Sequence, residues 1–205
     1  AVRGTLRRLD RADEVRAALA PYLTEHAGEL TFVQADLESD AGWAEAFQGV
    51  TALVHTASPF PIAQPKDPAT VMRPAVEGTQ RVLEAAAAAG VTRVVLTSST
   101  VAVLNEAKPD TLQDEADWCD VHLPTTTPYA RSKTLAERAA WDFINGSENK
   151  NKMELVAINP PLILGPVPNK DLPTSAEMVS TLMLGQVPGV ARMKVGIVDV
   201  RDVAS

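Results

Sequence analysis

A tyrosine and a lysine four residues apart carry the strongest chemical signal in the sequence. Tyr129 and Lys133 stand near the start of a predicted helix over residues 128–145, so both side chains lie on one helix face. A free tyrosine has a pKa of about 10, and a neighbouring ammonium group and a helix N-terminus both lower it. Such a phenol can donate a proton to a developing alkoxide and take one back in the reverse reaction. A plain surface pair is the alternative.

Polar and small residues follow two of the predicted strands. Thr97, Ser98 and Ser99 come directly after an apolar strand, and the segment 55–59 follows another. Ligands of open α/β sheets bind at the carboxyl ends of the strands, where a serine hydroxyl could bind a substrate oxygen. Small residues at 56–58 would let a ligand approach the backbone. A Ser/Thr turn that satisfies its own backbone, or a simple exit into a loop, is the alternative.

Charged residues follow two further strands. Arg7 and Arg8 close the first predicted strand, and Asp36 follows the next one. In a dinucleotide-binding fold an arginine at the first position accommodates a 2′-phosphate, which a guanidinium can bind with two hydrogen bonds. Asp36 could accept a hydrogen bond from the adenine amino group. Solvated surface charge for the arginines and a helix cap for Asp36 are the alternatives.

Short apolar strands and longer helical segments alternate along the chain. Strands are predicted over residues 2–7, 30–34, 52–55, 91–96, 155–159 and 195–198, and helices over 11–19, 40–47, 69–89, 128–145 and 175–184. The segments 51–54 and 93–96 are apolar without alternation, which is typical of a parallel sheet covered on both faces. The sequence therefore predicts an α/β, doubly wound fold.

Composition narrows the functional classes. The chain has 205 residues, 45% of them hydrophobic, and a net charge of −7, which argues against a nucleic-acid or acidic-lipid surface. Cys119 is the only cysteine, which excludes an internal disulfide and a cysteine zinc cluster, and the three histidines have no ligand spacing. We therefore expect no metal. The absence of a long apolar run or a signal-peptide pattern predicts a cytoplasmic protein with no membrane partner.

The order of these motifs resembles the extended short-chain dehydrogenase/reductases over essentially the whole chain. The resemblance is greatest to the branch with dihydroflavonol reductases, cinnamoyl-CoA reductases and microbial aldehyde and ketone reductases. The segments that carry it are Arg7, Ala35-Asp36-Leu37, His55-Thr56-Ala57-Ser58-Pro59, Thr97-Ser98-Ser99, Tyr129 with Lys133, Asn159-Pro160-Pro161 with Gly165-Pro166, and 198–204.

The resemblance implies an NADPH-dependent reduction of a small carbonyl substrate by a Rossmann-fold enzyme. Tyr129 would donate the proton, Lys133 would lower its pKa and bind the nicotinamide ribose, and Ser99 would polarise the carbonyl. The residues implied in NADP binding are Arg7, Asp36, Leu37, Thr56, Ala57, Ser58, Thr97, Lys133, Pro160 and Leu162. A monomer or homodimer is expected.

Two departures from the family pattern shape these expectations. No Gly-x-x-Gly-x-x-Gly turn is present, so we expect that the first strand–helix unit is missing. On this interpretation the chain is a fragment that alone binds NADPH poorly. Residues 1–160 would be a partial NADP-binding Rossmann domain and 161–205 the start of the substrate-binding region.

The second departure concerns the substrate. Leu104 stands where the dihydroflavonol reductases have an asparagine, and residues 116–119 echo the cinnamoyl-CoA reductase signature only in part. A reductase of varied aldehydes or ketones is therefore favoured over either plant activity. The alternatives are a nucleotide-sugar epimerase, a hydroxysteroid dehydrogenase/isomerase, or a dinucleotide-binding protein without catalysis.

Overall fold

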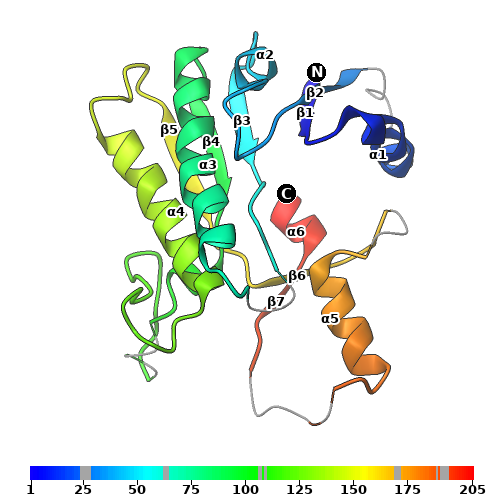
Figure 1. The fold of residues 1–205 in the computed structure, drawn as a ribbon, viewed down its shortest axis with the longest axis vertical. Coiled ribbons are helices and arrows are strands. Elements are labelled where there is room, and N and C mark those ends of the chain that lie inside the picture. Colours follow the sequence, from blue (N-terminus) through cyan, green and yellow to red (C-terminus); the bar gives the residue numbers. More distant parts are fainter. Residues whose placement is uncertain are drawn as a thin grey trace.

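The computed structural model describes residues 1–23, 29–61, 65–105, 108, 110–168, 172–187, 189 and 194–205. Strands and helices alternate along the chain (Figure 1). The strands are β1 (Val2–Leu6), β2 (Leu30–Gln34), β3 (Ala52–His55), β4 (Arg93–Thr97), β5 (Glu154–Ile158), β6 (Leu162–Leu164) and β7 (Ile197–Asp199). The α-helices are α1 (Ala12–Leu19), α2 (Trp43–Ala46), α3 (Ala69–Ala88), α4 (Pro128–Asn145), α5 (Thr174–Met183) and α6 (Val200–Ala204). Two short 3₁₀ helices are η1 (Leu9–Arg11) and η3 (Thr100–Ala102).

Every strand pair in the described residues is parallel, as the apolar strands predicted. The strands form three sheets in the orders β1-β2, β3-β4-β5 and β6-β7. In the central sheet Leu53 lies beside Val94, and Val94 lies beside Leu155. β1 pairs only with β2, and β3 pairs only with β4, so each has one unpaired edge among the described strands.

The core lies between the central sheet and the helices α3 and α4, which run side by side across it (Figure 1). Val82 and Leu83 from α3, Ala140 from α4, and Val94 and Leu155 from the sheet are all buried. Burying a Val or Leu side chain stabilises a fold by about 1.5–3 kcal/mol. These contacts therefore fix the position of α4, which carries Tyr129 and Lys133, against the end of β4.

Coverage of the sheet on both faces was predicted, and this is wrong for the described residues. Val54, Val95 and Val156 share one row of the central sheet and point away from the α3 and α4 side. Val54 is 67% exposed and Val156 is 55% exposed. The apolar character of the strands thus correctly predicted parallel pairing, but no described helix buries this second face.

Element boundaries largely agree with the sequence predictions. The strands 30–34 and 52–55 and the helix 128–145 are confirmed to the residue. The helix predicted over 40–47 is shorter, because Gly42 takes a left-handed conformation (φ 87°) and a Cβ there would overlap the Gln34 carbonyl. The three-residue strand β6 was not predicted. No helix among the described residues is long and apolar enough to cross a membrane.

Candidate active site

The chemistry-bearing residues meet at the carboxyl end of β4. Ser98 and Ser99 follow this strand directly, and both are buried. The Lys133 ammonium reaches the same strand from α4, where Nζ donates a hydrogen bond to the Thr97 carbonyl at 3.2 Å. The structure therefore brings together Ser99 and Lys133, which the sequence placed only on separate elements.

The start of α4 is built to present Tyr129. Thr127 is the N-cap, and its side-chain oxygen accepts a hydrogen bond from the Ala130 N–H at 3.1 Å. Pro128 takes the first helical position, where its missing N–H costs nothing. The ring of Tyr129 packs against that of Phe60, with 5.0 Å between the ring centroids. The cap and the ring contact together fix the direction of the phenol.

Ser99 holds a fixed place beside this phenol. It is the N-cap of η3, where its Oγ accepts a hydrogen bond from the Val101 N–H at 3.4 Å. Its hydroxyl also donates a long hydrogen bond of 3.5 Å to the Pro160 carbonyl. The Ser99 side chain also interacts with the Tyr129 phenol and favours its charged form. The Ser99 hydroxyl and the Tyr129 phenol therefore lie near each other at the end of β4.

The Tyr129 pKa is raised above 10.0, opposite to the lowering predicted from Lys133. Burial is the main cause, since it disfavours the phenolate, and the interaction with the Ser99 side chain offsets this only in part. The Lys133 ammonium is bonded to the Thr97 carbonyl. The phenol is therefore protonated at neutral pH in this structure.

Lys133 is itself strongly perturbed. Burial lowers its pKa from 10.5 to about 8, and the negative charge of Glu137 opposes this lowering. A lysine with a pKa near 8 is still mostly charged at neutral pH. Burying that charge costs about 3 kcal/mol at pH 7, because each tenfold change in proton affinity corresponds to about 1.4 kcal/mol. Such a cost is typical of functional sites rather than of structural surface pairs.

Glu137 and Asn159 belong to this site, although sequence reasoning did not single them out. The Glu137 side chain is 5% exposed, and its Oε2 accepts a hydrogen bond from Asn159 Nδ2 at 2.8 Å. The same amide nitrogen donates to the Ser99 carbonyl at 3.2 Å. The signal for Glu137 was its spacing of four residues from Lys133, which places both on one helix face. Asn159 thus links the Ser99 backbone to the acid behind Lys133.

The two arginines after β1 differ in their surroundings. Arg8 is paired with Asp10 through two hydrogen bonds. The Arg7 side chain is exposed and forms no ion pair within the described part of the chain. Of the two, Arg7 therefore has the guanidinium that is free for an anionic ligand.

Asp36 and Leu37, which follow β2, both have structural contacts. Asp36 Oδ1 accepts a hydrogen bond from the Glu38 N–H at 3.0 Å, which closes a local turn. Leu37 lies against Gly78 of α3 so closely that a Cβ at Gly78 would come within 2.8 Å of its side chain. Asp36 keeps a partly exposed carboxylate after this bond.

The remaining predicted residues lie in loops at the ends of β3 and β5. Thr56 and Ala57 are exposed, whereas the Ser58 hydroxyl is buried and has no hydrogen-bond partner in the described chain. Pro160 is half-buried, and its carbonyl accepts the bond from Ser99. The Leu162 N–H donates to the Gly196 carbonyl and joins β6 to the segment before β7. Leu162 is therefore tied to the later part of the chain.

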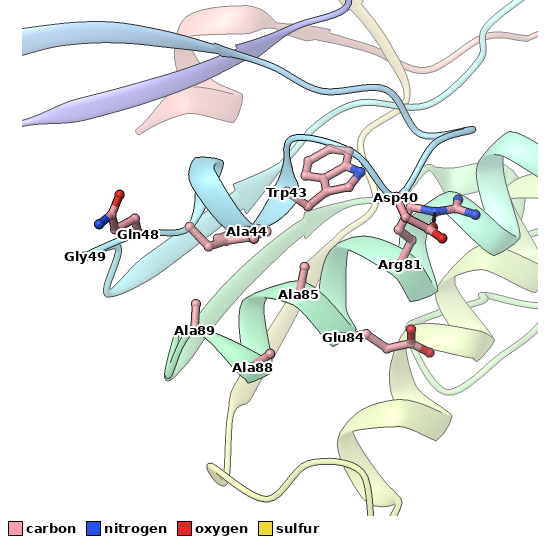
Figure 2. A pocket seen from close by; sticks show the side chains of 11 residues that line it. Asp40, Trp43, Ala44, Gln48, Gly49, Arg81, Glu84, Ala85, Ala88 and Ala89 are labelled. Atoms are coloured by element: carbon pink, nitrogen blue, oxygen red, sulfur yellow. Dashed lines mark hydrogen bonds and ion pairs between the residues drawn. The ribbon is translucent and has the colours of Figure 1, made fainter.

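A groove away from this site lies between two helices. Its volume is about 660 Å³, and it runs between α2 and α3, with Trp43 on one side and Ala85 and Ala88 on the other (Figure 2). Of its three charged residues, Asp40 and Arg81 are bonded to each other, and the third is Glu84. It contains none of the acid–base residues described above, so its size does not indicate catalysis. Among the described residues no group of three His, Cys, Asp or Glu side chains could hold a metal ion.

Comparison with known proteins identifies the family. The model of the 3-beta hydroxysteroid dehydrogenase/isomerase family matches residues 5–190. The chain belongs to this family. This match confirms the resemblance to the extended short-chain dehydrogenase/reductases. The match to solved structures of such reductases confirms the Rossmann-type fold.

Curated relatives of this family member include plant and yeast reductases. Cinnamoyl-CoA reductase 1 of Petunia hybrida is 36% identical over 208 residues, covering 99% of this chain and 59% of the relative. The NADPH-dependent methylglyoxal reductase of Saccharomyces cerevisiae is 33% identical, covering 90% and 61%. The chain thus spans about three fifths of the length of these relatives.

Solved structures agree with the family assignment. The yeast methylglyoxal/isovaleraldehyde reductase in complex with NADPH matches with a TM-score of 0.82 and 30% identity, covering 99% of this chain and 64% of that one. Vestitone reductase from alfalfa (Medicago sativa) matches with a TM-score of 0.73 and 31% identity, covering 100% and 62%.

Proposed function

We propose that the protein containing this chain reduces an aldehyde or ketone reversibly to the alcohol with NADPH. The observation that carries the proposal is that the Ser99 side chain interacts with the Tyr129 phenol, with the Lys133 ammonium at the end of the same strand. Each of these residue types alone has a structural explanation. Their meeting at one strand end is what a carbonyl reductase requires.

In the reduction direction Tyr129 donates a proton to the carbonyl oxygen. Its raised pKa supports this role, because the phenol is protonated at neutral pH. The Ser99 hydroxyl lies beside the phenol and polarises the same carbonyl oxygen by a hydrogen bond. Lys133 places a buried positive charge near the oxygen on which negative charge develops. The reverse reaction uses the same groups, with Tyr129 accepting the proton.

The residues around this centre fit a phosphorylated dinucleotide. Arg7 offers a free guanidinium at the end of β1, suited to a 2′-phosphate. Lys133 uses one of its three N–H groups on Thr97, and a ribose hydroxyl can accept a hydrogen bond from another. Thr56 and Ala57 expose backbone at the end of β3. NADPH, when bound, supplies the hydride, and the chain supplies binding, orientation and the proton.

The remaining assignments complete this proposal. Asp36 and Leu37 would contact adenine, Thr97 and Ser58 would lie near the middle of the cofactor, and residues around Pro160 and Leu162 would face the nicotinamide. Residues 1–160 would form the cofactor-binding part and 161–205 the start of the substrate-binding part, in a cytoplasmic monomer or homodimer. The free, buried Cys119 fits a reducing compartment.

The test uses the two tyrosines of the chain as a matched pair. In the product of the whole reading frame, Tyr129→Phe should lower kcat/KM for NADPH oxidation with a panel of aldehydes by about 10²–10⁴-fold. Tyr22→Phe is the control, because Tyr22 is 60% exposed and far along the chain from the site. Unchanged turnover in Tyr129→Phe would show that another group donates the proton.

A second candidate is oxidation of a hydroxysteroid, which the name of the matching family favours. The same residues would act with Tyr129 as the base. A substrate panel distinguishes carbonyl reduction from hydroxysteroid oxidation. A protein that oxidises hydroxysteroids with an oxidised cofactor, and does not reduce small aldehydes with NADPH, would favour hydroxysteroid oxidation. A purified protein that retains tightly bound NAD⁺ would instead favour an epimerase.

A further inference from the structure

A small cavity lies directly behind Lys133. Its volume is about 10 Å³, and residues from β3, the end of β4 and α4 line it. A cavity needs at least about 10–15 Å³ of this kind of volume to hold one water molecule, together with two to four polar partners. The size therefore matches a single water and nothing larger.

Three buried polar atoms belong to the walls of this cavity and have no partner. They are His55 Nε2, Ser58 Oγ and Ser98 Oγ, three of the four buried side-chain atoms without a hydrogen bond in the described structure. A buried donor or acceptor without a partner destabilises a fold, so three of them around one cavity indicate a common partner. By contrast, Thr79 lines the same cavity, but its hydroxyl already donates to the Ala75 carbonyl at 2.7 Å.

The charges around the cavity also favour a water. Lys133 and Glu137 both line it, yet no salt bridge joins them. His55 remains neutral, because burial and the Lys133 charge lower its pKa to about 4. A neutral imidazole offers one donor and one acceptor, and a serine hydroxyl offers both, so these groups can satisfy a water in more than one orientation.

We infer that one water molecule occupies this cavity, bound by His55, Ser58 and Ser98, and that it positions the Lys133 ammonium. The inference rests on the proposed function for its catalytic consequence. His55, Ser58 and Ser98 are thus positioning residues, which act on the reaction through Lys133. The water accepts a hydrogen bond from the ammonium and supports its charged form inside the protein.

The first readout is independent of activity. A crystal structure of the product of the whole reading frame, at a resolution that shows ordered water, should place one water within hydrogen-bond distance of His55 Nε2 and Ser98 Oγ. The Ser58→Ala/Ser98→Ala double variant should lose it, and Thr79→Val should keep it. A wild-type cavity without water overturns the inference, whether or not the protein reduces aldehydes.

The second readout is the pH profile of kcat/KM. Loss of one charge-assisted hydrogen bond should move the alkaline limb of the double variant to lower pH by about one pH unit, while Thr79→Val leaves it in place. If the double variant does not fold, Ser98→Ala alone provides the same comparison. An unmoved limb in an active variant that has lost the water refutes the positioning role. If the wild-type protein does not reduce carbonyl compounds, the proposed function is refuted. The crystal structure then still decides whether the cavity holds a water.

Discussion

Acidification should destabilise this protein through His55. The side chain is 5% exposed and lies near the positive charge of Lys133. Burial, and after it the repulsion from Lys133, lowers the pKa of His55 from 6.5 to about 4. In the unfolded chain the imidazole takes up its proton near pH 6.5, whereas in the folded protein it stays neutral down to about pH 4. Between these values the unfolded state binds more protons, so stability falls as the pH falls.

The size of the effect follows from these two pKa values. Moving from pH 7 to pH 5 should remove about 2 kcal/mol from the free energy of unfolding, and the complete loss, below pH 4, is about 3 kcal/mol. This is a large part of the stability of a typical domain.

Urea denaturation at about pH 5 and about pH 7 measures this pH dependence of the free energy of unfolding directly. The free energy of unfolding at pH 7 minus that at pH 5 should be about 2 kcal/mol smaller in His55→Gln than in the wild type. This holds whatever the absolute stability of the variant. His122→Gln is the matched control, because His122 lies in a loop outside the buried core. Equal pH dependence in the wild type and His55→Gln would refute the reasoning.

Three further outcomes are expected. The kcat/KM for reduction should fall above about pH 8, where Lys133 loses its proton, and a pH–rate profile measures this. Arg7→Ala should raise the KM for NADPH by about 10- to 100-fold and that for NADH much less, whereas Arg73→Ala on α3 should change neither in steady-state assays. Thr127→Ala should lower the free energy of unfolding by about 1 kcal/mol, measured by urea denaturation, because the N-cap of α4 is lost.

The sequence was sufficient for the elements that rest on local signals. Thr127 and Pro128 mark the start of α4 by cap chemistry, and Gly90 ends α3 in a left-handed conformation (φ 85°), as its position predicted. The order of strands and helices predicted parallel pairing, and with it the meeting of strand ends that assembles the site. These features depend on residues close together in the chain.

Other features depend on contacts that no local pattern contains. The direction of the change in the Tyr129 pKa was mispredicted, because burial of the phenol outweighs the groups that favour its charged form. The strand β6 has three residues and forms only because β7 pairs with it. Asn159 is part of the Asn-Pro-Pro motif, but its bonds to Ser99 and Glu137 appear only in three dimensions.

The amide of Asn159 has a consequence for the engineering of this enzyme family member. Because one side chain holds both the Ser99 backbone and the Glu137 carboxylate, the loop after Ser99 and the electrostatic surroundings of Lys133 cannot be altered independently. Substitutions in the loop after Ser99 that reshape the pocket should therefore show epistasis with substitutions at Glu137, even where neither residue contacts the other. A mutant library that varies only the loop after Ser99, or only Glu137, would therefore reach fewer substrate specificities than one that varies both.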